Sequence, residues 1–424
     1  MAKVAWRLLP LIVLIYFIAY IDRTNVGFAA ISMNRDLGFS AYLYGWGAGI
    51  FFIGYALFEV PSNVILHRVG ARVWIARIMV TWGVVSGCMT LVSGPASFLV
   101  VRFLLGVAEA GFFPGVLLYF TYWFPAAYRA RVVSALFLAV PGSNAVAAAI
   151  SGALLQMDGV LGLAGWKWMF LLESLPAVLL APVVLAFLTD RPAGAQWLDA
   201  DEREWLVSRL AEEDRGIKSA HRHLTLYEAL TDRRVVSLSL IYLTIVSATY
   251  GITFFLPLIV SLHGLSLVNI GFVTAVPYVI GTIGMVIWAW SSDRRHERRW
   301  HFTLAAVVAA VGLLAAAAWS RNLYLAIAAM SLAAIGLYGS KPSFWPMPST
   351  FLSGTAAAGG IALVNSIGNL GGFAGPYVVG WIRDVTGSYE MGLVFLAACA
   401  LLSAAIALAT VRPEAAPGSK PMEV

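Results

Sequence analysis

The chain has 424 residues, of which 60% are hydrophobic and only 12% are charged. A soluble domain carries about 25% charged residues, so this composition excludes an ordinary soluble enzyme or binding domain. The net charge of +6 would suit an acidic partner such as nucleic acid, but the basic residues gather in alternate loops, which indicates membrane topology instead.

Apolar runs long enough to cross a membrane recur along the sequence. Each can span about 30 Å of hydrocarbon at about 1.5 Å per residue. Long runs without short alternating segments favour helices over barrel strands. We therefore expect an all-α membrane protein with twelve transmembrane helices. The predicted spans are residues 9–29, 43–66, 73–92, 97–120, 132–154, 168–188, 235–258, 270–290, 302–319, 323–345, 357–382 and 391–411.

The distribution of basic residues predicts that both termini are cytoplasmic, because cytoplasmic loops of membrane proteins are enriched in lysine and arginine. The first apolar run lacks a small-residue cleavage site, so it is expected to be a retained span. Cys88 and Cys399 both fall within spans, which predicts no disulfide framework. The loops predicted to face outwards hold few basic residues, namely Arg35, Lys167, Arg321 and Arg383.

The longest polar interruption, residues 189–234, separates six spans from six. It predicts an N-terminal half (1–188), a cytoplasmic linker and a C-terminal half (235–424), as in transporters built from parallel repeats with a site between them. Within the linker, residues 199–214 have the pattern of a helix with a charged face. A helix on the cytoplasmic surface is expected, and a site for a regulatory partner is the alternative.

Two short basic turns occupy matching places in the two halves. Residues 67–72 read His-Arg-Val-Gly-Ala-Arg and residues 293–298 read Asp-Arg-Arg-His-Glu-Arg. The first turn resembles the G-x-x-x-D-R-x-G-x-R loop of the major facilitator superfamily, with Asn63 and His67 in place of Gly and Asp. The resemblance covers essentially the whole chain and implies a gating latch. The implied gating residues are Arg68, Gly70, Arg72, Asp293 and Arg294.

Four longer stretches, in the same order and spans, resemble the anion:cation symporter family of that superfamily. They are residues 20–25, 58–63, 102–114 and 365–372. This resemblance implies uptake of a small organic anion together with a proton, by a protein that is monomeric and lies in the bacterial inner membrane. Bacterial members of the family include tartrate, glucarate, galactonate and hydroxyphenylacetate carriers.

Charged residues within spans are costly and usually face a cavity or pair there. Arg23 lies on one face of its span with Tyr16 and Tyr20, and its guanidinium can hold a carboxylate through two N–H donors. Arg23 would otherwise simply neutralise Asp22 or Glu109. The resemblance implies the first role, and it implies that Tyr20 and Tyr55 line the substrate site; otherwise each tyrosine is a structural aromatic.

Asp22 and Glu109 are the candidate proton carriers. Burial favours the protonated form of a carboxylate, whereas a nearby cation favours the charged form, so a substrate that binds Arg23 would move the proton. The resemblance implies the same two protonation sites. Arg102 lies on the same face as Glu109 but about 10 Å along the axis, too far for ordinary direct contact. The alternative is a permanent ion-pair network with Arg23 and Arg102.

Three residues on the C-terminal half are further candidates for substrate binding. Lys341 precedes a proline-rich stretch that predicts a broken helix, and broken helices are tolerated where they line a cavity. Lys341 could hold a second carboxylate, which would favour a dianion, or extend to the membrane edge. Asn365 and Asn369 share a face and could bind substrate hydroxyls or only pack against neighbours.

The two remaining acidic residues in spans are assigned structural roles. Glu59 lies near the cytoplasmic end of its span and is expected to brace arginines of the adjoining loop. Glu173 is expected to have a structural partner.

The predicted function is proton-coupled import of a small organic carboxylate, a hydroxy or sugar acid or a dicarboxylate such as tartrate, by alternating access. No histidine lies within a span, no P-loop is present, and no nucleophile–base pair or metal-ligand cluster appears in the spans. The sequence therefore predicts neither an enzyme nor a cofactor or metal site. Alternatives are an aromatic carboxylate importer, an uncoupled uniporter or anion exchanger, and a membrane receptor that transports nothing.

Overall fold

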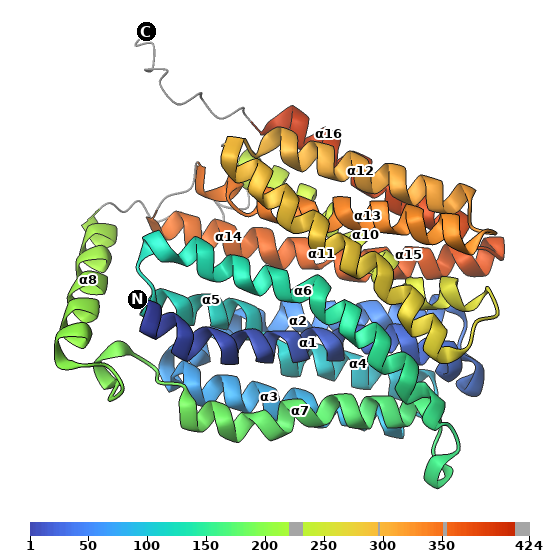
Figure 1. Cartoon of the computed structure of the whole chain (residues 1–424), viewed down its shortest axis with the longest axis horizontal. Coiled ribbons are helices and arrows are strands. Elements are labelled where there is room, and N and C mark those ends of the chain that lie inside the picture. The colour runs from blue at the N-terminus through green and yellow to red at the C-terminus, as the bar shows by residue number, and fades with distance from the viewer. Residues whose placement is uncertain (220–231, 296, 351–353, 412–424) are drawn as a thin grey trace.

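The computed structural model describes residues 1–219, 232–295, 297–350 and 354–411, and this part of the chain is helical with no strand. Its long helices lie side by side in one bundle (Figure 1). Eleven helical runs in this part are long and apolar enough to cross a membrane, with α4 (Pro95–Glu109) and α5 (Phe112–Trp123) counting as one run. The predicted all-α membrane fold is confirmed.

The first part of the chain forms seven helices, and its fourth span is broken. Glu109 ends α4, Ala110 is extended, and Gly111 is left-handed with φ of 82° before α5 begins. This break, which the sequence analysis did not predict, separates two helices within one span. The helices are α1 (Ala2–Leu37), α2 (Ala41–Val69), α3 (Ala71–Gly87), α4 (Pro95–Glu109), α5 (Phe112–Trp123), α6 (Ala126–Leu154) and α7 (Gly165–Phe187).

The last part of the chain forms seven further helices. The span predicted at 357–382 is built from α14 and α15, each of 16 residues, which meet at Leu370. The proline-rich stretch after Lys341 breaks the helix later than expected, since α13 continues through Pro342 to Phe344. The helices are α10 (Arg233–Ser261), α11 (Leu267–Arg295), α12 (Arg299–Ala318), α13 (Leu323–Phe344), α14 (Gly354–Asn369), α15 (Gly371–Thr386) and α16 (Glu390–Thr410).

The charged helix predicted in the linker is α8 (Ala200–Ser219), which lies across the end of the bundle where α1 begins (Figure 1). Polar contacts tie it and the residue before it to α1 and α6. Lys3 Nζ is 3.1 Å from Asp199 Oδ2 and 2.8 Å from Glu202 Oε2, and Glu213 accepts from the backbone N–H of Ala126 at 3.1 Å. Such exposed pairs contribute little stability each.

The two parts of the chain pack closely through α2 and α15, at the end opposite α8. Asp384 accepts hydrogen bonds from the backbone N–H groups of Ala41 (3.0 Å) and Tyr42 (2.9 Å), which begin α2. Nearby, a Cβ added to Gly45 would lie 2.3 Å from the carbonyl oxygen of Pro376. Only glycine allows the two backbones to approach this closely.

Replacing Gly45 with alanine is expected to lower stability by about 1–3 kcal/mol, because the added methyl group collides with backbone that cannot rotate away. Thermal unfolding of the purified protein in detergent measures the effect. Gly142→Ala in α6 is the matched control, since a Cβ there meets nothing within 4 Å. An equal change in melting temperature for the two variants would contradict the packing argument.

Candidate functional site

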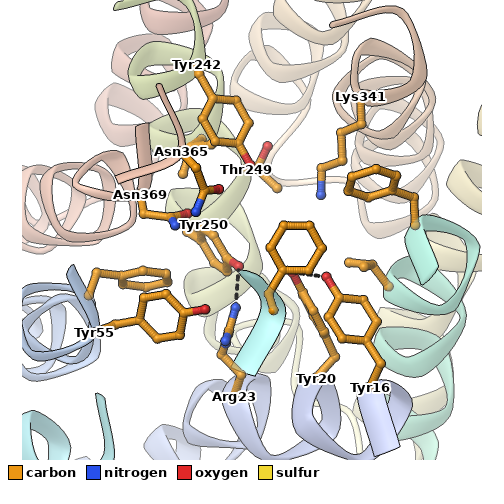
Figure 2. Close-up of a pocket in the computed structure, with 15 residues that line it drawn as sticks. Tyr16, Tyr20, Arg23, Tyr55, Tyr242, Thr249, Tyr250, Lys341, Asn365 and Asn369 are labelled. Carbon is orange, nitrogen blue, oxygen red and sulfur yellow. Dashed lines mark hydrogen bonds between the residues drawn. The ribbon is translucent and has the colours of Figure 1, made fainter. Parts of the chain in front are cut away.

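A pocket lies between the two parts of the chain, and all six residues predicted to bind substrate line it (Figure 2). Those residues come from helices far apart in the sequence: α1, α2, α13 and α14. Their role in binding stays a prediction. The lining consists of Tyr16, Tyr20, Arg23, Phe52, Tyr55, Phe113, Phe137, Val140, Tyr242, Val246, Thr249, Tyr250, Lys341, Asn365 and Asn369.

Arg23 is the central cation of the pocket. One terminal nitrogen pairs with Glu109 Oε1, and the other donates to the hydroxyl of Tyr250 at 3.3 Å (Figure 2). The guanidinium carbon lies 4.9 Å from the ring centre of Tyr20 and 5.4 Å from that of Tyr55, so both aromatic faces favour the cation. Of the two carboxylates that Arg23 was expected to reach, the ion pair is formed with Glu109.

Asp22 and Arg102 lie away from the pocket lining. Asp22 is buried and accepts hydrogen bonds from Ser86 Oγ and, at 3.2 Å, from Asn25 Nδ2. Arg102 is fully buried and donates from Nε to the carbonyl oxygen of Gly47 at 3.2 Å, which ties α4 to α2. As expected from their spacing, Arg102 makes no ion pair with Glu109, nor with any other carboxylate in the described residues.

The predicted network of ion pairs therefore reduces, in the described part, to one pair, Arg23 with Glu109. The proton-coupling roles of Asp22, Glu109 and Arg102 stay predictions. Glu109, which pairs with Arg23, is the last residue of α4 and directly precedes the break at Ala110.

Lys341 extends into the pocket from α13, on the wall opposite Arg23 (Figure 2). Its ammonium nitrogen lies 5.0 Å from the ring centre of Tyr338. Within the described residues it has no ion pair and no hydrogen bond. This direction argues against the alternative that Lys341 reaches the membrane edge.

Glu59 does not brace the arginines of the adjoining loop, so that expectation was wrong. Its side chain is buried and turned towards α14, where Oε1 accepts from Asn365 Nδ2 at 2.7 Å and Oε2 accepts from Ser366 Oγ at 3.2 Å. The reason is that the face of α2 that carries Glu59 packs against α14 and not against the loop. Glu173 has the structural partner expected, because it accepts from Ser151 Oγ at 2.7 Å.

The two predicted gating turns each make contacts within their own part of the chain. At the first turn, Gly70 adopts φ of 100°, a left-handed conformation that suits glycine, and the backbone N–H of Arg72 donates to Asp190 at 2.8 Å. Asp190 thus supplies a carboxylate to a turn in which His67 replaces the family's aspartate. Arg68 is exposed.

At the second turn, Asp293 pairs with Arg298 at 2.6 Å, and Arg294 lies over the ring of Trp290. Among the residues with described contacts, no hydrogen bond or ion pair joins the two turns. Their gating role stays a prediction.

Sequence reasoning missed the contribution of α10 to the pocket. Tyr242, Val246, Thr249 and Tyr250 line it at spacings of four, three and one, and three of them carry hydroxyl groups on one side of a helix. Polar residues that recur on one face of an otherwise apolar span could have indicated this wall. Tyr250 matters most, because it is the neutral partner of Arg23.

Comparison with known proteins agrees with this architecture. Residues 12–376 match the sequence profile described as Major Facilitator Superfamily. The chain belongs to that superfamily. Its relatives include carriers of the anion:cation symporter type, which confirms the branch indicated by the four sequence stretches. The protein is a multi-pass membrane transporter.

Two relatives and one solved structure illustrate the similarity. A protein of Agrobacterium vitis named "Putative tartrate transporter" is 51% identical over 97% of this chain and 91% of its own length. A quinolone resistance transporter of Acinetobacter baumannii is 42% identical, over 93% of this chain and 90% of its own. The crystal structure of a bacterial homologue of the human lysosomal transporter Spinster is 18% identical, with a TM-score of 0.76 over 95% of this chain and 96% of that one, which supports the fold.

Proposed function

We propose that this transporter imports a small organic carboxylate together with protons, by alternating access across the bacterial inner membrane, with both termini in the cytoplasm. The observation that carries the proposal is Lys341, a cation that faces the pocket opposite Arg23 and has no carboxylate partner in the described residues. A charge within a membrane is costly unless a partner neutralises it. An anionic substrate is the partner that this pocket lacks.

Arg23 supports the same proposal from the other wall. Its Nε is buried and has no hydrogen-bond partner in the described residues, while its terminal nitrogens are occupied by Glu109 and Tyr250. A substrate carboxylate that binds Arg23 would add a second negative charge beside that of Glu109, with one guanidinium to neutralise both. Glu109 and the substrate therefore compete for Arg23.

This competition is a physical basis for proton coupling. Protonation of Glu109 removes its negative charge and frees the guanidinium, which then binds the substrate carboxylate. Because each event favours the other, the affinities for proton and anion are linked in both directions. Substrate release on the cytoplasmic side lets Arg23 recover Glu109 as its partner, and the proton leaves. Asp22, whose carboxylate makes no hydrogen bond or ion pair with the Arg23 guanidinium in the described residues, would act on this pair only indirectly.

A dicarboxylate such as tartrate is the proposed substrate class. Arg23 and Lys341 stand on opposite walls and can each hold one carboxylate, and Asn365 and Asn369 line the same pocket on the side away from Lys341, where they can bind hydroxyls (Figure 2). The name of the Agrobacterium vitis relative agrees with this class. An aromatic carboxylate is the second candidate, favoured by the tyrosine and phenylalanine rings that form much of the lining.

The function is tested by uptake of labelled tartrate into proteoliposomes. An inward proton gradient is expected to drive accumulation, which an uncoupler abolishes. Accumulation that persists in the presence of the uncoupler would favour an exchanger or uniporter. Specific binding without flux would favour a receptor. A screen of aromatic monocarboxylates in the same assay separates the two substrate classes.

Replacing Lys341 with methionine is expected to weaken binding of dicarboxylates by about tenfold or more, the effect of losing one hydrogen bond to a charged group. Binding of monocarboxylates should change little, because Arg23 alone holds their single charge. Thermal shift against matched pairs of mono- and dicarboxylates measures this, since a ligand raises the melting temperature by mass action. Lys167→Met, in the first turn of α7 and outside the pocket lining, is the control. Equal losses for both ligand classes would refute a second carboxylate clamp.

A further inference from the structure

Glu59 is a buried carboxylate for which the proposed mechanism has no use. Its residue is 3% exposed, and no lysine or arginine pairs with it in the described residues. Instead it receives two hydrogen bonds from adjacent residues of α14, Asn365 and Ser366. A buried carboxylate that links helices from the two parts of the chain needs an explanation beyond packing.

The hydrogen bonds fix how Glu59 acts on its neighbour. Both of its oxygens receive donors, so the carboxylate is an acceptor at each, as an ionised carboxylate must be. The side chain of Asn365 can offer either its amide NH₂ or its carbonyl oxygen. With an acceptor on the Glu59 side, the NH₂ group is held there at 2.7 Å.

Asn365 also lines the pocket, and Figure 2 shows its amide on the side away from Lys341. Since Nδ2 donates one of its two N–H groups to Glu59, the carbonyl oxygen Oδ1 is turned away from Glu59 and can accept from a ligand. The residue therefore presents an acceptor to the pocket. An acceptor selects a ligand that brings a donor.

We propose that Glu59 is a positioning residue that makes the pocket selective for hydroxylated carboxylates, by holding Asn365 with its carbonyl oxygen towards the substrate. The inference rests on the proposed function, because it concerns which carboxylate the pocket takes. A substrate hydroxyl satisfies Oδ1 of Asn365. A deoxy analogue leaves that acceptor without a donor, and a keto analogue sets a second carbonyl oxygen against it.

Three four-carbon diacids test this selectivity for a hydroxyl group. They are malate, succinate and oxaloacetate, which carry a hydroxyl, a methylene and a ketone at the same position. The wild-type protein is expected to bind malate at least about tenfold more tightly than succinate, because an unpaired buried polar group discriminates strongly. Oxaloacetate is expected to bind no better than succinate. Dissociation constants come from titration calorimetry or thermal shift on the full-length protein.

Variants at position 59 separate positioning from packing. Glu59→Gln keeps a carbonyl oxygen that can accept from Asn365, so it should preserve the preference for malate. Glu59→Met keeps the length of the side chain but removes the acceptor, so the amide can rotate and the preference should fall to within about twofold. Glu173→Met, which removes a buried carboxylate outside the pocket, is the matched control and should leave the preference unchanged.

A double-mutant cycle provides the second readout. Asn365→Ala alone should abolish the preference, and adding Glu59→Met to it should change the preference no further, because Glu59 acts through Asn365. This comparison remains informative if Glu59→Met lowers stability, since selectivity is a ratio measured on the folded fraction.

The possible failures are distinct. A wild-type protein that binds no carboxylate would refute the proposed function itself. A wild-type protein that binds the diacids without preferring malate, or a Glu59→Met variant that keeps the preference, would overturn the role of Glu59 while leaving the transporter proposal intact.

Discussion

Replacing Arg23 with alanine is expected to lower tartrate uptake by about 100-fold or more. Two losses combine in this variant. The substrate carboxylate loses a hydrogen bond to a charged donor, which contributes about 1.5–3 kcal/mol, and Glu109 loses its cation within the membrane, which costs about 3–5 kcal/mol when the partner stays charged. Initial rates in proteoliposomes and dissociation constants for tartrate measure the effect.

Arg23→Lys distinguishes charge from geometry. Lysine retains the cation but lacks the planar fork that binds a carboxylate through two parallel hydrogen bonds, so we expect an intermediate loss of about tenfold. Arg35→Ala, an exposed arginine on the same helix, is the matched control and should transport normally. Normal uptake by Arg23→Ala would mean that the substrate carboxylate is held elsewhere.

The sequence could predict which residues meet at the pocket because charge within a membrane span is rare and costly. Arg23 and Lys341 are conspicuous for that reason, and the tyrosine face of the first span pointed to the same side. The six candidate binding residues come from four helices, yet they line one pocket. Sequence patterns identify well those polar residues that would be unfavourable in contact with lipid.

The direction of a side chain could not be predicted in the same way. Asp22 and Arg23 are adjacent in sequence, but consecutive residues of a helix point about 100° apart, so one faces α3 and the other the pocket. Glu59 turns towards α14 rather than its own loop for a similar reason. Such choices depend on which helix packs against which face, and that information lies in segments distant in the chain.

The break between α4 and α5 illustrates the same limit. Its sequence, Ala110-Gly111 followed by two phenylalanines and a proline, is apolar throughout and reads as one continuous span. Only the packed structure reveals that α4 ends at Glu109 and that Glu109 pairs with Arg23. That position makes Glu109 a stronger candidate for proton coupling than Asp22, although the sequence treats the two carboxylates alike.

Replacing Glu109 with glutamine is expected to uncouple transport from the proton gradient. Glutamine imitates the protonated glutamate, so it leaves the guanidinium of Arg23 free for substrate at every pH. Exchange of labelled for unlabelled tartrate across the membrane should continue within about tenfold of the wild-type rate, because it needs no change of protonation. Accumulation driven by a proton gradient should be lost, because proton and anion affinities are no longer linked.

Asp22→Asn is the comparison that decides between the two carboxylates. The Asp22 carboxylate is held by Ser86 and Asn25 and makes no hydrogen bond or ion pair with the Arg23 guanidinium in the described residues. Its neutral variant should therefore retain part of the gradient-driven accumulation, whereas Glu109→Gln retains none. The opposite pattern would move the coupling site to Asp22 and make the Arg23–Glu109 pair structural. If both variants, and the double variant, still accumulated tartrate against a gradient, competition for Arg23 would not be the source of the coupling.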